Sequence, residues 1–166
     1  MIIGLGGSDR LYGGTGNDEI RGGPGRDRLY GRAGGDRLFG GSGPDLLEGD
    51  GGNDALSGED GDDRLFGREG ADIVRGGFGS DRLGGGAQND RLYGGPGRDI
   101  VLGSSGNDRL FAGGGRNDLF GEAGNDLLDA RNGSYDRVIG GRGRDRALVD
   151  RRDLVRFVER AFRSGR

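Results

Sequence analysis

The stretch Gly22-Gly23-Pro24-Gly25-Arg26-Asp27-Arg28-Leu29-Tyr30 decides the fold of this chain, because its pattern recurs every nine residues. The clearest marker is the aspartate, which fills 15 of 16 slots, with Asn117 in the remaining slot. One extra residue lies between the last regular slot and Asp136, after which the series resumes and ends at Asp145. A fixed short period predicts a solenoid whose repeats stack on one another.

Each nine-residue unit divides into turn-forming residues and a short strand. Glycine occupies the first position of nearly every unit and the position two residues before most aspartates, as in Gly40 and Gly43. Glycine suits left-handed backbone and close backbone approach. An aliphatic residue follows each aspartate by two positions, and in a strand it points to the opposite side from its neighbours. We therefore expect six residues of loop and three of strand, with an aliphatic ladder inside and an arginine-rich outer face.

Two units, arranged as strand, loop, strand and loop, make one coil of 18 residues. The sequence therefore predicts an all-β fold, a flattened right-handed parallel β-roll of about 16 nonapeptide repeats and about eight coils over residues 1–149. Strands of adjacent coils lie about 4.8 Å apart. Aspartates 18 residues apart should therefore stack along the same edge of the roll.

Residues 150–166 leave the nine-residue period. Leu154, Phe157, Val158, Ala161 and Phe162 recur at the spacing of one helix face. This pattern predicts an amphipathic C-terminal α-helix, and solenoids need a terminal cap. We interpret the helix as that cap, with a secretion signal or a partner-docking helix as the alternative.

The composition excludes several classes of function. The chain of 166 residues contains no cysteine and no histidine, which excludes disulfides and argues against zinc or copper sites. The commonest general base is absent, and no polar constellation interrupts the repeat, so we predict that the chain is not an enzyme. A net charge of −3 argues against a nucleic-acid partner. No apolar run is long enough for a transmembrane segment.

The stacked carboxylates require a cation. Two unit charges about 4.8 Å apart repel by roughly 1 kcal/mol in water and about 3.5 kcal/mol near a protein surface. One aliphatic residue in nine gives a thin core, and ordering 43 glycines has a high entropic cost. Ca²⁺ accepts six to eight carboxylate and carbonyl oxygens in a flexible shell, whereas Mg²⁺ prefers a tight octahedron and retains its waters. The sequence therefore predicts calcium sites.

The unit Gly-Gly-x-Gly-x-Asp-x-aliphatic-x resembles the nonapeptide of RTX (repeats-in-toxin) proteins, the hemolysin-type calcium-binding repeats, a standard example of a calcium-binding solenoid motif. The resemblance covers residues 4–148. It implies a secreted, extracellular bacterial protein that folds on binding calcium, with a type I secretion system or a parent domain outside this chain as partner.

The resemblance also implies that each ion lies between repeats n and n+2, bound by both aspartates and by loop carbonyls. The expected metal ligands are Asp9, Asp18, Asp27, Asp36, Asp45, Asp54, Asp63, Asp72, Asp81, Asp90, Asp99, Asp108, Asp126 and Asp145. Asn117 and Asp136 would pair with each other, and we expect the weakest or an empty site there. Gln88 stands in place of a glycine, so we expect a distorted loop before Asp90.

The expected function is that of a calcium-binding structural module that folds on binding several Ca²⁺ ions. The alternative is a repetitive surface-binding or adhesin-like module that uses the aromatic and arginine residues of the outer face. Seven aromatic residues follow an aspartate slot by three positions, and they form either a binding stripe or packing over the strands. They are Tyr12, Tyr30, Phe39, Phe66, Tyr93, Phe111 and Phe120.

Overall fold

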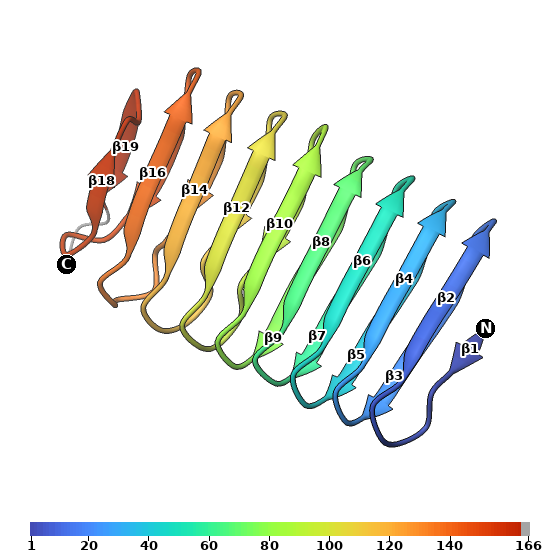
Figure 1. Cartoon of the computed structure of the whole chain (residues 1–166). Coiled ribbons are helices and arrows are strands. Elements are labelled where there is room, and N and C mark those ends of the chain that lie inside the picture. The colour runs from blue at the N-terminus through green and yellow to red at the C-terminus, as the bar shows by residue number, and fades with distance from the viewer. Residues whose placement is uncertain (164–166) are drawn as a thin grey trace.

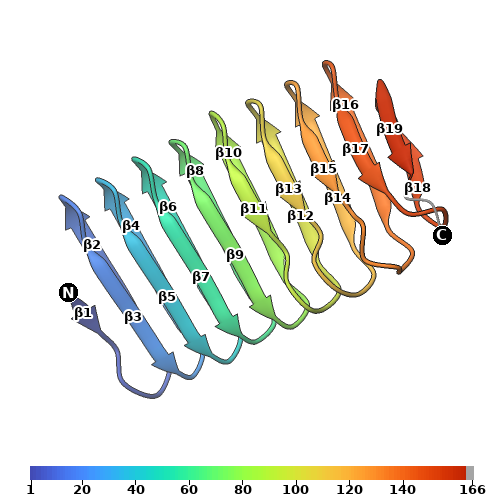
Figure 2. The ribbon, with the colours of Figure 1, turned by 180° about the vertical axis from the view of Figure 1, so that it is seen from behind.

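The chain winds back and forth between two parallel β-sheets in the computed structural model, which describes residues 1–163 (Figure 1). One sheet has ten strands in the order β1-β3-β5-β7-β9-β11-β13-β15-β17-β19. The other has nine strands in the order β18-β16-β14-β12-β10-β8-β6-β4-β2. Figure 2 shows the same stack from behind, with successive turns advancing steadily from the N-terminus to the C-terminus.

Odd-numbered strands form the ten-stranded sheet and even-numbered strands the nine-stranded sheet. The odd-numbered strands are β1 (Ile2–Ile3), β3 (Glu19–Pro24), β5 (Arg37–Ser42), β7 (Ala55–Asp60), β9 (Ile73–Phe78), β11 (Arg91–Tyr93), β13 (Arg109–Phe111), β15 (Leu127–Asp129), β17 (Arg146–Val149) and β19 (Arg160–Arg163). The even-numbered strands are β2 (Arg10–Thr15), β4 (Arg28–Ala33), β6 (Leu46–Gly51), β8 (Arg64–Glu69), β10 (Arg82–Ala87), β12 (Ile100–Ser105), β14 (Asp118–Ala123), β16 (Arg137–Arg142) and β18 (Leu154–Arg156).

The register of the sheets follows the sequence period. Leu29 pairs with Leu47, and Leu47 pairs with Leu65, each 18 residues further along the chain. Every pairing between the strands is parallel, for example that between β4 and β6. The prediction of an all-β parallel solenoid with two repeats per turn is therefore confirmed.

The interior is a double column of aliphatic side chains. The residues two positions after each aspartate, from Ile20 to Ala147, have no more than 1% of their surface exposed. Burying one such side chain stabilises the fold by about 1.5–3 kcal/mol. Because each turn contributes only two of them, the core is continuous but thin.

Most strands are six residues long rather than the three that we predicted. In β4, the residues Gly31, Arg32 and Ala33 continue the strand through the first half of the expected loop, and both Leu29 and Gly31 are buried. The backbone at these positions is extended enough to pair with the next coil, as Arg32 does with Asp50. The turn itself is therefore only about three residues long, which brings the aspartates of adjacent coils close together.

The predicted C-terminal helix is wrong for the residues that the structure describes. Leu154 and Val155 pair with Arg137 and Val138, and β19 pairs with β17, so residues 154–163 add another turn to the roll. The nine-stranded sheet therefore has one strand more than the eight coils predicted from the sequence. Edge pairing satisfies the open N–H and C=O groups of the last coil, whereas a short isolated helix is only marginally stable. Residues 164–166 of the expected helix lie outside the described residues.

The loop at Gln88 departs from its neighbours in its backbone bonds. The N–H groups of Gly61 and Gly79 donate to carbonyls of the next coil, but those of Gly70 and Gln88 make no equivalent bond. Gln88 adopts a left-handed backbone with φ of 79°, in place of the glycine found in the regular loops. The aspartate ladder continues past this loop, since the Asp72 amide donates to Oδ1 of Asp90 at 2.8 Å. A left-handed non-glycine residue costs roughly 1–2 kcal/mol, which glycine at this position avoids.

The described part of the chain contains no helix with the length and hydropathy needed to cross a membrane.

Candidate metal sites along two aspartate ladders

The aspartates line the two edges of the roll, where the chain passes from one sheet to the other (Figure 1). Each lies directly before the first residue of a strand, so that the strand register determines its position. Asp9 and Asp18 at the N-terminal end are partly buried. From Asp27 to Asp145, every slot residue has at most 3% of its surface exposed. Carboxylates buried to this extent need partners.

From Asp27 onward, one oxygen of each slot side chain has a partner in the preceding coil. The backbone N–H of Asp36 donates to Oδ1 of Asp54 at 2.7 Å, and that of Asp54 donates to Oδ1 of Asp72 at 2.8 Å. The same bond recurs along both edges, from Asp9 with Asp27 to Asp126 with Asp145. The structure thus places side by side the residues 18 apart that the RTX resemblance pairs.

The second oxygen has no hydrogen-bond partner at thirteen of these positions, although it is buried. These Oδ2 atoms belong to Asp9, Asp27, Asp36, Asp45, Asp54, Asp63, Asp72, Asp81, Asp90, Asp99, Asp108, Asp126 and Asp145. A buried acceptor without a partner costs about 1–3 kcal/mol, and a charged one costs more. Rows of such atoms indicate that a ligand supplies the missing positive charge.

The first glycine of each loop leaves a cradle beside this free oxygen. A Cβ on Gly40 would lie 2.5 Å from Oδ2 of Asp45 and 2.8 Å from the carbonyl oxygen of Gly58 in the next coil. A Cβ on Gly103 would meet Asp108 and Gly121 in the same way. A carboxylate oxygen and a carbonyl oxygen therefore converge beside each of these glycines, and both are ligands that Ca²⁺ prefers.

The donor set is only partly made of side chains. Within residues 1–163, no three acidic, histidine or cysteine side chains gather into a metal-binding group. A bound cation would therefore take two carboxylates from adjacent coils and draw the rest of its ligands from loop carbonyls. This composition suits a hard cation with a flexible coordination shell.

The model of the family described as RTX calcium-binding nonapeptide repeat (4 copies) matches the chain in nine overlapping stretches, from residues 3–38 to residues 102–135. The chain belongs to the RTX calcium-binding repeat family. A search of the curated proteins finds no match. The RTX match extends over nearly all the regular turns and ends in the loop that carries the extra residue.

Burial raises the pKa of many ladder aspartates in the RTX roll. The pKa of Asp54 rises from 3.8 to about 7, first because burial disfavours the charged form and also because of the charges of Asp72 and Asp36, while a backbone hydrogen bond lowers it. The pKa values of Asp63, Asp90 and Asp99 also rise to about 7. Without a cation, the folded roll therefore holds protons that the unfolded chain has already lost.

This difference predicts opposite pH responses with and without calcium. Between about pH 4 and 7, the ion-free roll binds more protons than the unfolded chain, so its stability falls as pH rises through this range. In chelator, acidification from pH 7 to 5 should increase the β-sheet signal. In calcium, the same acidification should weaken the fold, because protons compete for the ligand oxygens. Circular dichroism during pH titration checks this, and equal slopes in the two conditions would contradict it.

The slots at Asn117 and Asp136 differ from the rest of the ladder. Nδ2 of Asn117 donates to the carbonyl of Gly115 at 3.3 Å. Oδ2 of Asp136 accepts a hydrogen bond from Nδ2 of Asn132 at 2.9 Å. By contrast, Oδ2 of Asp145 in the following loop lacks a partner, as in the regular loops. The two residues singled out from the sequence are thus the ones whose polar atoms are satisfied within the chain.

Two sets of ladder residues were missed from the sequence. Asp153 accepts the N–H of Asp136 at 3.0 Å and extends its column, but the spacing of 17 residues hid it. A second, outer ladder uses the side chain before the slot, whose Oδ1 accepts a backbone N–H one coil further on. Its members are Asn17, Asn53, Asp62, Asn89, Asn107 and Asn125. The signal was the recurrence of asparagine directly before the aspartate slot.

The outer face shows aromatic rings packed on one another and under arginines. Tyr12 stacks on Tyr30 with ring centroids 5.0 Å apart, and Tyr93 stacks on Phe111 at 4.8 Å. The guanidinium of Arg21 lies 4.6 Å from the ring centroid of Phe39. Such contacts contribute about 0.5–1 kcal/mol at exposed sites. They favour the interpretation that these rings pack over the strands.

Proposed function

We propose that this chain is a structural module that binds several Ca²⁺ ions along both edges of the roll and depends on them to fold. The observation that carries the proposal is the set of thirteen buried carboxylate oxygens without a hydrogen-bond partner. The proposed ligands are Asp9, Asp18, Asp27, Asp36, Asp45, Asp54, Asp63, Asp72, Asp81, Asp90, Asp99, Asp108, Asp126 and Asp145, together with loop carbonyls. When bound, the ion supplies the positive charge that neutralises the stacked carboxylates.

The chain's own residues determine which cation fits. The paired aspartates of adjacent coils offer two carboxylates, and the glycine cradles give access to backbone carbonyls. A site assembled from two flexible loops suits the variable coordination of Ca²⁺ better than the strict octahedron of Mg²⁺. Calcium therefore favours the ordered stack of loops over the extended, glycine-rich chain.

The family also supports a proposal about where the protein works. RTX proteins are typically secreted, and a module that needs calcium to fold suits an extracellular space rich in calcium. We therefore place the chain in a secreted bacterial protein, with a type I secretion system or a neighbouring domain as partner. In this proposal the module has a structural role and no catalytic one.

Counting the bound ions tests the proposal. The 16 slots form fourteen pairs of residues in adjacent coils, and Asn117 takes part in two of them, which leaves twelve pairs of carboxylates. We expect close to twelve Ca²⁺ ions per chain by equilibrium dialysis and elemental analysis. Asp54→Asn should lose ions, because Asp54 contributes to the pairs with Asp36 and with Asp72.

Asp62→Asn is the matched control. Asp62 belongs to the outer ladder, where its Oδ1 accepts the N–H of Ser80 and where asparagine does the same at Asn53. This variant should bind as many ions as the parent chain. A parent chain with one or two ions, or an unchanged number in Asp54→Asn, would rule out sites between the stacked loops.

A further inference from the structure

In the loop between β15 and β16, a side-chain amide lies beside the ladder carboxylate. The two N–H groups on Nδ2 of Asn132 are shared among three acceptors, the carbonyl oxygens of Gly113 and Gly115, at 2.8 and 3.0 Å, and Oδ2 of Asp136, at 2.9 Å. Two loop carbonyls of one coil and a slot carboxylate of the next are the kinds of oxygen that a cation would bind. One amide nitrogen contacts all three.

The orientation of the Asn132 amide follows from its other end. Oδ1 of Asn132 accepts the backbone N–H of Ser134 at 2.7 Å. A flipped amide would direct Oδ1 at two carbonyls and a carboxylate, and would direct Nδ2 at an N–H group. Only one orientation therefore satisfies both ends.

The glycine cradle is also filled at this position. Ala112 and Ala130 occupy the first loop positions that glycine holds elsewhere, and both are completely buried. The N–H of Ala112 donates to the carbonyl of Asp129 at 2.9 Å, just as the N–H of Gly94 donates to that of Phe111. The two alanine methyl groups thus occupy the positions beside which, in the regular loops, a carboxylate oxygen and a carbonyl oxygen converge.

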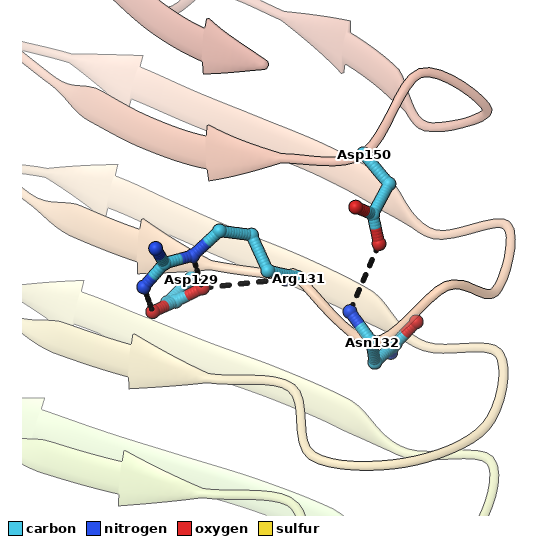
Figure 3. A network of polar contacts seen from close by, with 4 residues as sticks. All are labelled: Asp129, Arg131, Asn132 and Asp150. Atoms are coloured by element: carbon cyan, nitrogen blue, oxygen red, sulfur yellow. Dashed lines mark hydrogen bonds and ion pairs between the residues drawn. The ribbon is translucent and has the colours of Figure 1, made fainter. Parts of the chain in front are cut away.

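Hydrogen bonds within the chain also hold the Asn132 loop in place. Oδ2 of Asp150 accepts the N–H groups of Asn132 and Gly133, at 2.9 and 2.6 Å, as Figure 3 shows for the bond between Asn132 and Asp150. Oδ1 of Asp153 accepts the N–H of Asp136, and Oδ2 of Asp153 accepts that of Asp150. Arg131 pairs with Asp129 at the start of the same loop (Figure 3).

We propose that the Asn132 amide is a built-in replacement for the cation at the Asn117–Asp136 position, so that this edge of the roll contains a rung that needs no metal. The residues here do not fit a calcium ion. Asn117 contributes an amide to the pair in place of a carboxylate, and alanine methyl groups stand in the cradle. The converging oxygens already accept hydrogen bonds from Asn132. The extra residue in this loop, which looked like an irregularity in the sequence, lets Asn132 reach inward. This inference rests on the proposed calcium binding at the other loops.

Side-chain hydrogen exchange of Asn132 tests the proposal directly. In nitrogen-15-labelled full chain, under whichever condition folds it, the Asn132 side-chain NH₂ protons should exchange about tenfold or more slowly than those of exposed Asn107. Equal exchange rates would overturn the proposal. The comparison needs only folded protein, so it stays informative even if the chain folds in chelator and the proposed calcium dependence fails.

A pair of isosteric variants gives a second test. Asn132→Asp places a carboxylate among three oxygens, whereas Asn107→Asp keeps the Oδ1 that accepts the N–H of Asn125. In saturating calcium, Asn107→Asp should unfold at the parent midpoint. Asn132→Asp should either unfold at a lower midpoint or bind one additional Ca²⁺ ion, as an all-oxygen site would. An unchanged midpoint together with an unchanged number of ions in Asn132→Asp would overturn the proposal.

Discussion

Chelation of calcium at neutral pH should unfold the roll, and adding calcium back should restore the β-sheet signal in one cooperative step. Each site filled to about 100 times its dissociation constant contributes about 2.7 kcal/mol. Close to twelve such contributions exceed the roughly 5–15 kcal/mol by which a typical domain is stable. The thin core and the thirteen unpartnered carboxylate oxygens leave the ion-free roll without a compensating source of stability.

Far-UV circular dichroism during a calcium titration of chelator-treated protein measures this effect, with magnesium at the same concentrations as control. Magnesium should restore little of the signal, because the loops do not offer it a tight octahedron. A full β-sheet signal in chelator at pH 7 would show that the aliphatic ladder alone holds the fold. Calcium would then only adjust the stability.

Closing one cradle with a single methyl group should both destabilise the roll and weaken its calcium binding. In Gly49→Ala, the new Cβ would meet Oδ2 of Asp54 and would lie 2.8 Å from the carbonyl oxygen of Gly67. Overpacking of this kind costs about 1–3 kcal/mol. The methyl group also displaces the oxygens that would bind the ion, so this variant should bind fewer Ca²⁺ ions and need more calcium to fold.

Gly51→Ala in the same strand is the matched control. Neither Gly49 nor Gly51 has a left-handed backbone, so alanine is not strained by φ at either position. At Gly51 the nearest atom to a new Cβ is the carbonyl oxygen of Arg32, 3.6 Å away. Gly51→Ala should be neutral, or more stable by about 0.4–1 kcal/mol. The calcium midpoint of folding and the number of bound ions compare the two variants, and similar values for both would show that the cradle is not part of the site.

The repeat made the architecture predictable from the sequence. The aspartate every ninth residue and the aliphatic residue two positions later specify which side chains stack, because identical spacing in each unit permits only one register between coils. The pairs of ladder aspartates follow from the same spacing, since residues 18 apart occupy equivalent positions in adjacent coils. Asn117 and Asp136 stood out for the same reason, as departures from an otherwise uniform pattern.

In the C-terminal segment, the local hydrophobic pattern predicted the wrong secondary structure. Leu154, Phe157 and Val158 have helical spacing, yet residues 154–156 and 160–163 pair as strands. The open edge of the preceding coil offers a complete row of backbone partners, and this tertiary contact outweighs a helical pattern only a few turns long. Asp153 was hidden for a related reason, because its place in the ladder depends on pairing with Asp136 rather than on the nine-residue spacing.

The sequence by itself therefore determined the solenoid, its aliphatic ladder and the two rows of carboxylates, because these depend only on a strict period. Only the tertiary structure decided which oxygen of each carboxylate is free, since Oδ1 is occupied by an N–H from the neighbouring coil. It also decided that Asn132 reaches the oxygens of another coil, because an inserted residue changes the direction of a loop in a way that spacing does not encode. Contacts between coils, rather than residues within one repeat, determine where the roll leaves room for an ion and where it does not.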